Sequence, residues 1–255
     1  MCRTVLVIGI GAGDPEHLTL QAAAAIGRAD VFFEIDKGVP DLAALRATLL
    51  ARHARPDHRV VTAPEVPRDR DPADYVAEVA AWQAARATAY AAMIDAELPP
   101  GGVGAFLVWG DPALYDSTLR IVDEILARGA ATFAVEVVPG ISSIQLLAAR
   151  HRIALHRVGG SLHVTTGRNL VARGVDGLDD VVVLLDGTEA FTTLVGQPFD
   201  LSWGAYLGTP DEILLAGPID EVADAVVATR RQARASKGWI FDVYHLRRRT
   251  DDAGR

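Results

Sequence analysis

Three glycine-bearing turns, each following an apolar run, carry the chemistry that the sequence suggests. They read Gly9-Ile10-Gly11-Ala12-Gly13-Asp14-Pro15, Trp109-Gly110-Asp111-Pro112 and Pro139-Gly140-Ile141-Ser142-Ser143. The apolar runs are typical of parallel strands that are buried on both faces. Glycine lets the backbone approach a ligand closely, and the carboxyl ends of parallel strands meet at one edge of a sheet. The three turns together therefore predict a ligand crevice. Each turn taken alone could also be a plain β-turn, because Gly, Asp and Pro are common turn residues.

The first turn looks like a dinucleotide-binding fingerprint but departs from it at the sixth position. Asp14 stands where that fingerprint needs glycine or alanine, and its carboxylate would repel a pyrophosphate. Pro15 removes an amide donor and delays the next helix to about Thr19, away from the glycines. Glu34 and Asp36 come at the second expected strand, where a dinucleotide-binding fold has an acidic residue that bonds to the ribose hydroxyl. A nicotinamide-dependent oxidoreductase therefore stays as an alternative from a different class.

A segment without acidic residues, 137–175, concentrates positive charge in an otherwise acidic chain. Arginine pairs bidentately with carboxylates, so this segment favours a ligand with several carboxylates. Two of its arginines would equally suit the C-terminus of a helix, because the helix dipole favours positive charge there. Its basic residues are Arg150, His151, Arg152, His156, Arg157, His163, Arg168 and Arg173.

Composition limits the classes of function. The 255 residues are 50% hydrophobic and 23% charged, which suits a globular protein with a full core. The net charge of -8 argues against a nucleic acid or an anionic membrane as the main partner. A single cysteine, Cys2, excludes an internal disulfide and a multi-cysteine zinc site. We therefore expect a cytoplasmic protein without a bound metal and without a membrane span.

The first part of the chain, 1–138, alternates expected strands with expected helices, which predicts a doubly wound parallel sheet. One helix would be capped by Asp41, a long one would begin at Asp71-Pro72 and end near Leu98, and another would be capped by Asp116 or Ser117. The first helix would run from Leu18 to Arg28. The strands are expected at 4–10, 30–35, 59–62, 104–109 and 133–138.

The second part, 139–255, predicts a separate domain with a mixed sheet. Several of its apolar segments are joined by short links, and short links favour antiparallel pairing. Clear helical patterns occur only at 143–151 and 219–234. The expected strands are 162–166, 181–185, 201–207, 213–216 and 239–246.

The three turns, with His17-Leu18-Thr19 after the first and Ala113-Leu114-Tyr115 after the second, resemble in order and spacing the tetrapyrrole (corrin/porphyrin) methyltransferase family. The likeness covers nearly the whole chain. Within the family, four stretches look most like those of the members that methylate C-1 of precorrin-5 and release its acetyl group as acetate. They are residues 29–33, 36–38, 150–155 and 205–212. The resemblance implies the two-domain α/β tetrapyrrole methylase fold. It also implies S-adenosylmethionine bound in the cleft between the domains, and a homodimer.

Carried over by position, the resemblance implies a set of cofactor-binding residues in both domains. Two of them depart from the family pattern. Ala12 stands where many relatives have proline, and Asp186, which precedes Gly187, stands where some relatives have methionine. The implied cofactor-binding residues are Ala12, Trp109, Gly110, Asp111, Leu114, Ser142, Ser143, Leu185, Asp186, Ala205, Tyr206 and Gly208.

The implied reaction needs positioning more than it needs a metal, because the methyl donor carries the reactive centre. Loss of the acetyl group also needs an activated water, for which Asp36, Tyr115 and His163 are the candidate proton-transfer groups. Asp36 comes first because it follows the second strand at the same sheet edge. A turn role or an ion pair with Lys37 would explain Asp36 equally well. Arg150, Arg152, Arg157 and Arg168 would contact the acetate and propionate arms of the substrate.

Other functions stay open. Another precorrin or uroporphyrinogen methyltransferase would share the cofactor and the small polycarboxylate substrate. A diphthine synthase shares the cofactor fold but acts on a protein, and the acid-free arginine segment argues for a small polyacid instead. A non-catalytic tetrapyrrole carrier would bind the pigment and return it unchanged.

Overall fold

The computed structural model describes residues 2–36, 38–67, 69 and 74–249. Lys37 and the pair Asp71-Pro72 lie outside the described residues, so the ion pair and the helix start predicted there are not described. The chain forms two compact units, Met1–Ser142 and Ser143–Arg255. The division falls a few residues after the boundary suggested by the sequence, so the third glycine turn lies with the first unit.

The first unit contains a five-stranded sheet in the order β3-β2-β4-β1-β5, and every neighbouring pair is parallel. This confirms the predicted doubly wound parallel sheet. The runs at β1 and β4 are almost wholly buried, as predicted, because both strands lie inside the sheet. The expectation of burial on both faces is wrong for β5, which lies at the edge of the sheet and exposes Val135 and Val137. The strands are β1 (Arg3–Gly9), β2 (Val31–Asp36), β3 (Arg59–Pro64), β4 (Val103–Val108) and β5 (Phe133–Val138).

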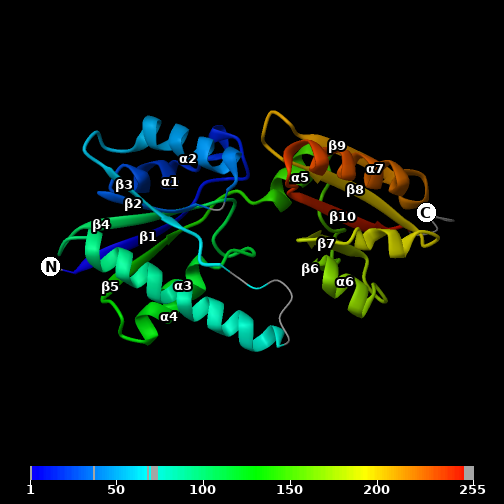
Figure 1. The fold of residues 1–255 in the computed structure, drawn as a ribbon. Coiled ribbons are helices and arrows are strands. Elements are labelled where there is room, and N and C mark those ends of the chain that lie inside the picture. The colour runs from blue at the N-terminus through cyan, green and yellow to red at the C-terminus, as the bar shows by residue number, and fades with distance from the viewer. Residues whose placement is uncertain (1, 37, 68, 70–73, 250–255) are drawn as a thin grey trace. The chain divides into compact units, whose positions relative to one another are not determined.

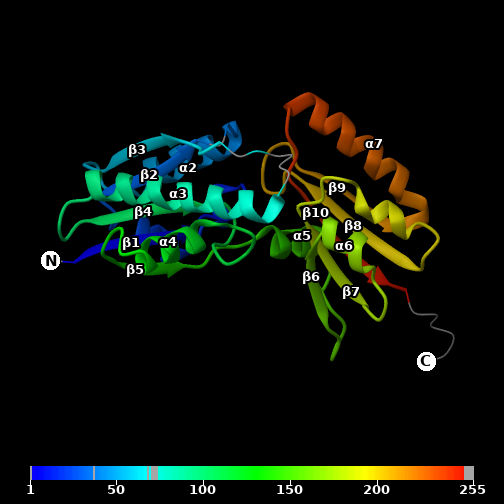
Figure 2. The same cartoon turned by 60° about the horizontal axis from the view of Figure 1, so that its bottom comes forward.

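Helices cover both faces of this sheet, as Figures 1 and 2 show. On β1, Leu6 and Ile8 pack with α1 and α2, whereas Val5 and Val7 pack with α3 and α4. This alternation follows from the two-residue period of a strand. The helical elements are η1 (Pro15–His17), α1 (Leu20–Ile26), α2 (Pro40–His53), α3 (Tyr75–Glu97) and α4 (Thr118–Ala127).

The helix starts show which caps the sequence could predict. The predicted cap by Asp41 is wrong: Pro40 occupies the first turn, and the N-cap residue is Val39, without a side-chain bond. Proline is well suited to that first position, so it moves the helix start ahead of Asp41. At α4 the N-cap residue is Ser117, but the side chain that bonds to the start of the helix is that of Asp116. The Asp116 carboxylate accepts the Thr118 amide at 2.6 Å, while the Ser117 hydroxyl accepts a hydrogen bond from Arg86 at 2.7 Å.

The second unit contains a five-stranded mixed sheet in the order β6-β7-β10-β8-β9. The pair β6 and β7 is parallel, and the other neighbouring pairs are antiparallel, as predicted. The last strand begins at Asp242, later than expected, and Trp239 before it packs edge-on against Tyr206. The strands are β6 (Leu162–Thr166), β7 (Asp180–Leu184), β8 (Phe199–Ala205), β9 (Ile213–Pro218) and β10 (Asp242–Arg248).

The expectation of only two helices in this part is wrong, because a third helix, α6, follows β6. Thr166 caps its start by accepting the Asn169 amide, and Gly174 ends it with φ of 68°. Residues of α6, η2 and α7 share a core with Trp203, whereas the neighbouring Gly204 faces Leu147 of α5. The helical elements are α5 (Ser143–His151), α6 (Gly167–Arg173), η2 (Ala190–Leu194) and α7 (Ile219–Lys237).

Candidate functional site

The first two glycine turns meet at the carboxyl edge of the first sheet. Strands β1 and β4 are neighbours, and beyond their ends Gly11 and Gly110 form an antiparallel bridge. The Gly110 amide donates to the Gly11 carbonyl at 2.8 Å, and the Gly11 amide donates to the Gly110 carbonyl at 3.4 Å. Both residues have positive φ, +80° and +75°, which glycine adopts without strain. The predicted meeting of these two turns is confirmed.

The third turn packs against the first two through backbone alone. A Cβ atom on Gly140 would lie 2.2 Å from the Gly110 carbonyl oxygen and 2.8 Å from the Gly9 Cα. A Cβ atom on Gly9 would lie 2.6 Å from the Gly140 amide nitrogen. These distances leave no room for any side chain, so the close approach of the three turns requires glycine at both positions.

Two of the predicted binding residues fasten the turns to one another. The Trp109 indole donates to the Ala12 carbonyl at 2.6 Å, which ties the second turn to the first. The Asp111 carboxylate accepts the Gly140 amide at 2.9 Å and the Ala113 amide at 2.8 Å, which ties the second turn to the third. The contacts of these side chains are therefore with the chain itself, and they position the backbone of the edge.

Beyond the second turn, Leu114 is half-buried and Tyr115 has a left-handed backbone, with φ of 52°. A non-glycine residue in this region is strained by about 1 kcal/mol or more, and such strain clusters at functional sites. The Tyr115 side chain is exposed. Partial burial raises the pKa of its phenol above the usual 10.0, so the hydroxyl keeps its proton at neutral pH. In the third turn Ser142 is buried, and Ser143 is the first residue of α5.

A cavity of about 230 Å³ opens where β2 and β3 end beside α2. Asp36 lines it, and its carboxylate also accepts the Gly38 amide at 2.8 Å, so the turn role weighed from the sequence is real. Sequence reasoning missed the charged residue behind it, Arg46, which lies on the same apolar side of α2 as its leucines. The full lining is Glu34, Ile35, Asp36, Val39, Leu42, Ala43, Arg46 and Thr62.

Arg46 is a buried charge held inside the first unit. Its guanidinium donates to the Leu107 carbonyl, near the end of β4, at 2.9 Å. Burial lowers the pKa of Arg46, and the nearby Glu34 carboxylate opposes that shift. The spacing of Leu42, Leu45, Arg46 and Leu49 puts the arginine on the buried side, which was the signal that could have found it.

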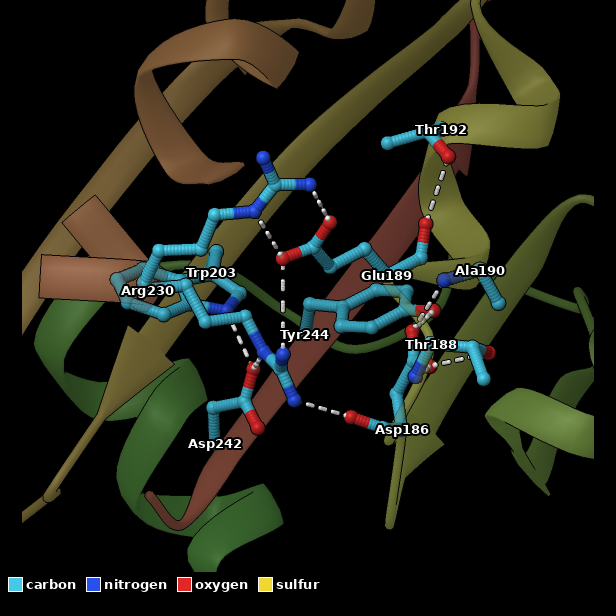
Figure 3. A network of polar contacts seen from close by, with 10 residues as sticks. Asp186, Thr188, Glu189, Ala190, Thr192, Trp203, Arg230, Asp242 and Tyr244 are labelled. Atoms are coloured by element: carbon cyan, nitrogen blue, oxygen red, sulfur yellow. Dashed lines mark hydrogen bonds and ion pairs between the residues drawn. The ribbon is translucent and has the colours of Figure 1, made fainter. Parts of the chain in front are cut away.

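In the second unit Asp186 belongs to a buried polar network, drawn in Figure 3. Its carboxylate accepts the Tyr244 hydroxyl at 2.8 Å and the amides of Ala190 and Thr188 at 2.7 and 3.0 Å. Its backbone carbonyl accepts a hydrogen bond from Arg230. Burial, followed by the charge of Asp186, raises the pKa of Tyr244 well above 10.0. The Asp186 side chain is thus fully engaged within its own unit.

The same network joins α7 to the sheet. Arg230 donates to Asp242 at 2.9 Å, and the Trp203 indole donates to the same carboxylate at 2.9 Å. Burial raises the pKa of Asp242, and Arg230 opposes that shift. Sequence reasoning named none of these partners, because they come from separate elements and follow no short motif.

The other predicted binding residues of the second unit lie at strand ends. Leu185 directly follows β7 with φ of 52° and is exposed, whereas Ala205 ends β8 and is buried. Tyr206 also has positive φ, and its hydroxyl donates to the Trp239 carbonyl at 2.6 Å. Gly208 has φ of 79°, and its amide donates to Glu212 at 2.8 Å. The residues just after β7 and β8, Leu185 and Tyr206, therefore both have a left-handed backbone.

The basic segment is partly used by the chain itself. Arg150 forms an ion pair with Glu212 at 2.8 Å, and Arg157 donates to the Arg248 carbonyl at 2.6 Å. Arg152 and Arg168 are exposed, and so is His163 on β6. Asp36 and Tyr115 lie in the first unit and His163 in the second. Within the described ranges, no group of three His, Cys, Asp or Glu residues is arranged to hold a metal ion.

Comparisons with known proteins give one consistent result. The family model described as tetrapyrrole (corrin/porphyrin) methylases matches residues 4–223. The chain is 46% identical to a precorrin-6A synthase (deacetylating) of Sinorhizobium sp, over 98% of this chain and 97% of that protein. It is 32% identical to a precorrin-2 C(20)-methyltransferase of Sinorhizobium sp, over 54% of this chain and 53% of that protein.

Solved structures share the fold. A cobalamin synthesis related protein (CobF) from Corynebacterium diphtheriae matches with a TM-score of 0.86 and 38% identity, over 97% of this chain and 99% of that chain. A uroporphyrin-III C-methyltransferase from Thermus thermophilus matches with a TM-score of 0.62 and 22% identity, over 96% of this chain and 92% of that chain.

Proposed function

Because the chain belongs to the tetrapyrrole (corrin/porphyrin) methylases, we propose that it methylates C-1 of precorrin-5 and releases the acetyl group as acetate. The product would be precorrin-6A, in cobalamin (vitamin B12) biosynthesis, and the methyl donor would be S-adenosylmethionine. The observation that carries the proposal is the 46% identity, over nearly the full length of both proteins, to a precorrin-6A synthase (deacetylating).

The glycine edge of the first unit fits a nucleoside that is held by backbone groups. At Gly110 the only atom near an added Cβ is the Ser142 Cα at 3.8 Å, an ordinary contact distance, so the space beside the Gly110 Cα is largely open. In this unit Ala12, Gly110, Leu114 and Ser142 would hold the donor, together with Ser143, the first residue of the second unit. Trp109 and Asp111 would fix the turns that present those residues. In the second unit we assign donor contacts to Leu185, Asp186, Ala205, Tyr206 and Gly208, for Asp186 through its backbone.

When bound, S-adenosylmethionine supplies an electrophilic methyl group on a sulfonium. The residues of this chain have the remaining tasks: they bind and orient the substrate and move protons. Tyr115 would act as a donor, because its raised pKa keeps the hydroxyl protonated. Asp36 and His163 would accept protons. Of the four arginines, Arg152 suits the carboxylate arms best, because it is exposed, whereas Arg150 and Arg157 already bond within the chain.

The experiment is incubation of the purified protein with precorrin-5 and S-adenosylmethionine, with acetate and methyl gain measured together. We expect one acetate for each methyl group transferred. Methylation without acetate would overturn the deacetylating assignment and favour another precorrin or uroporphyrinogen methyltransferase. Methylation of a translation factor would indicate a diphthine synthase, and binding of NADH in place of S-adenosylhomocysteine an oxidoreductase.

The proposal extends to a cytoplasmic homodimer that acts on a tetrapyrrole polycarboxylate and not on nucleic acid or membrane. The family likeness and the acidic composition support it. Within the part of the chain that the structure describes, no helix is both long and apolar enough to cross a bilayer. Light scattering on the purified protein would test the dimer, with a monomer mass as the contradicting result.

A further inference from the structure

The cavity at the end of β2 lies on the α2 side of the sheet, near the point where the pairing of β2 with β4 ends. The pairing of β2 with β4 stops at Phe33 and Phe106, whereas β1 and β4 stay paired up to Gly9 and Val108. The Val108 carbonyl bonds to the β1 side, through the Ile10 amide at 2.9 Å. The Leu107 carbonyl accepts Arg46 instead of a strand amide. Such a split at the carboxyl edge of an open α/β sheet is where ligands bind.

The polar groups of this cavity are arranged around an unused donor. Arg46 is 9% exposed, and among the described residues its Nε atom has no hydrogen-bond partner. A buried donor without a partner costs about 1–3 kcal/mol, which an oxygen atom of a ligand would recover. Glu34 and Asp36 lie on the same face of β2, toward α2, because Ile35 between them packs into the opposite core.

Glu34 is the better placed of the two carboxylates. It is half-buried, whereas Asp36 is exposed and already accepts the Gly38 amide. Glu34 is also the largest favourable charge acting on Arg46. Across the described part of the chain, no hydrogen bond or ion pair engages its carboxylate. A carboxylate in this setting is available to accept a proton.

The size of the cavity selects its occupant. Pockets for drug-sized ligands measure about 300–1,000 Å³, and one water occupies about 30 Å³ of liquid. At about 230 Å³ the cavity is too small for a tetrapyrrole ring. It has room for one small arm of a substrate together with a water molecule. Arg46, which lines the cavity, bonds to the Leu107 carbonyl, three residues before Gly110 in the sequence.

Building on the function proposed above, we propose that this cavity is the deacetylation subsite, with Arg46 and Glu34 as catalytic residues. Arg46 donates to the acetyl carbonyl oxygen, as guanidinium groups do where negative charge develops. Glu34 takes a proton from the attacking water. Asp36 lies at the same cavity as a second carboxylate.

Water cleaves the acetyl group from C-1 by addition followed by collapse. The water oxygen forms a bond to the acetyl carbon while its proton passes to Glu34, and the carbonyl oxygen becomes an oxyanion beside Arg46. Collapse of this intermediate breaks the bond between the acetyl carbon and C-1, and the electron pair stays on C-1. Acetic acid leaves and ionises to acetate. C-1 uses its electron pair to accept the methyl group, and Glu34 returns its proton to solvent.

The test is the Glu34→Gln variant of the full chain, assayed with precorrin-5 and S-adenosylmethionine in water enriched in oxygen-18. We expect acetate release to fall about 100-fold or more, the usual contribution of a general base. Methylation of C-1 should fall with it, while binding of S-adenosylhomocysteine stays unchanged. Acetate from the wild type should carry one oxygen-18 atom. The matched control is Glu136→Gln on β5, whose carboxylate pairs with Arg28 at the surface, and it should retain wild-type rates.

Arg46→Lys is the second variant, because lysine keeps the charge but loses the Nε donor. We expect about a 100-fold fall in acetate release. Arg52→Lys on the same helix, where Arg52 pairs with the exposed Glu16, is its control. If Arg46→Lys fails to fold, Glu34→Gln decides the question.

The failure modes are distinct. A wild-type protein that releases no acetate from precorrin-5 overturns the proposed function and this subsite with it. Acetate release by Glu34→Gln within about twofold of the wild type overturns the subsite alone. Acetate without oxygen-18 overturns attack by water.

Discussion

The glycine edge of the first unit and the polar network of the second are stabilised by opposite means. The edge is held mainly by backbone: Gly9 and Gly140 lie so close to each other and to the Gly110 carbonyl that neither could carry a methyl group. The network is held by side chains: Arg230, Asp242 and Tyr244 bury charge and hydroxyl groups against one another. One unit therefore closes its sheet edge with backbone alone, whereas the other gains rigidity from buried side-chain contacts.

The two regions should respond differently to substitution. A backbone site is damaged by adding atoms, because there is no space for them. A buried charge network is damaged by removing atoms, because each loss leaves a charge without its partner. Substitutions in each region, with a matched control for each, test that difference.

Removal of Arg230 should have the largest effect. Arg230→Met leaves the Asp242 carboxylate buried without its cation, so we expect the free energy of unfolding to fall by about 3–5 kcal/mol. Urea denaturation measures the change. The control is Arg231→Met, one residue further on α7, where the arginine is exposed and pairs with Glu189 at 2.8 Å; it should change the free energy of unfolding far less, because solvent screens an exposed pair. Equal losses in the two variants would contradict the network.

Addition of one methyl group at the glycine edge should come next. In Gly140→Ala the new Cβ would meet the Gly110 carbonyl at 2.2 Å. We expect the free energy of unfolding to fall by about 2–3 kcal/mol and S-adenosylhomocysteine to bind at least about tenfold more weakly. Denaturation and calorimetric titration measure the two effects. Gly27→Ala is the control, because φ there is -64° and the nearest atom is 3.4 Å away. Wild-type affinity in Gly140→Ala would contradict the assigned edge.

The side-chain tie at that edge should matter less. Asp111→Asn replaces one acceptor by a donor, so the amide of Gly140 or of Ala113 loses its partner. We expect a loss of about 1–2 kcal/mol and a several-fold weaker affinity for S-adenosylhomocysteine. Asp95→Asn, at an exposed pair with Arg3, serves as the control and should change neither quantity measurably. An unchanged affinity in Asp111→Asn would show that the tie does not position the turns.

The smallest effect is a dependence of stability on pH in the second unit. Burial, then the charge of Arg247, lowers the pKa of His245, while Asp180 opposes the shift. The unfolded chain therefore binds the proton first, near pH 6.5. The stabilising contribution of neutral His245 is present above that pH and is lost as the pH falls from about 6.5 toward the folded pKa.

Denaturation at several pH values measures this loss. We expect the slope between about pH 7 and 5.5 to shrink in His245→Gln and to persist in His156→Gln, whose ring is exposed. The same slope in both variants would assign the effect to another group.

The sequence predicts the glycine edge well because the physical requirement is local. Only glycine suits the conformation at Gly110 and the contact at Gly140, so the motif itself reports the geometry. Apolar runs such as Val5 to Ile8 predict the strands for the same reason, since both faces are buried. The short helix α6 was missed because seven residues are too few to show a helical period.

The rest depends on contacts between distant residues. Tyr244 reaches Asp186 from 58 positions away, and Arg46 reaches Leu107 from 61 positions away. No local pattern specifies such partners, because the fold alone brings them together. Asp186 is the clearest case: its position matches the binding motif, and its carboxylate is nevertheless engaged by Tyr244 and two backbone amides.

The most direct measurement is a crystal structure of the full chain with S-adenosylhomocysteine. We predict the ligand against the backbone of Gly110 and the turn from Pro139 to Ser142, with the Asp111 carboxylate still bonded to the Gly140 amide. A ligand bound elsewhere, with no contact to Gly11, Gly110 or Ser142, would contradict the proposed methyl-donor site.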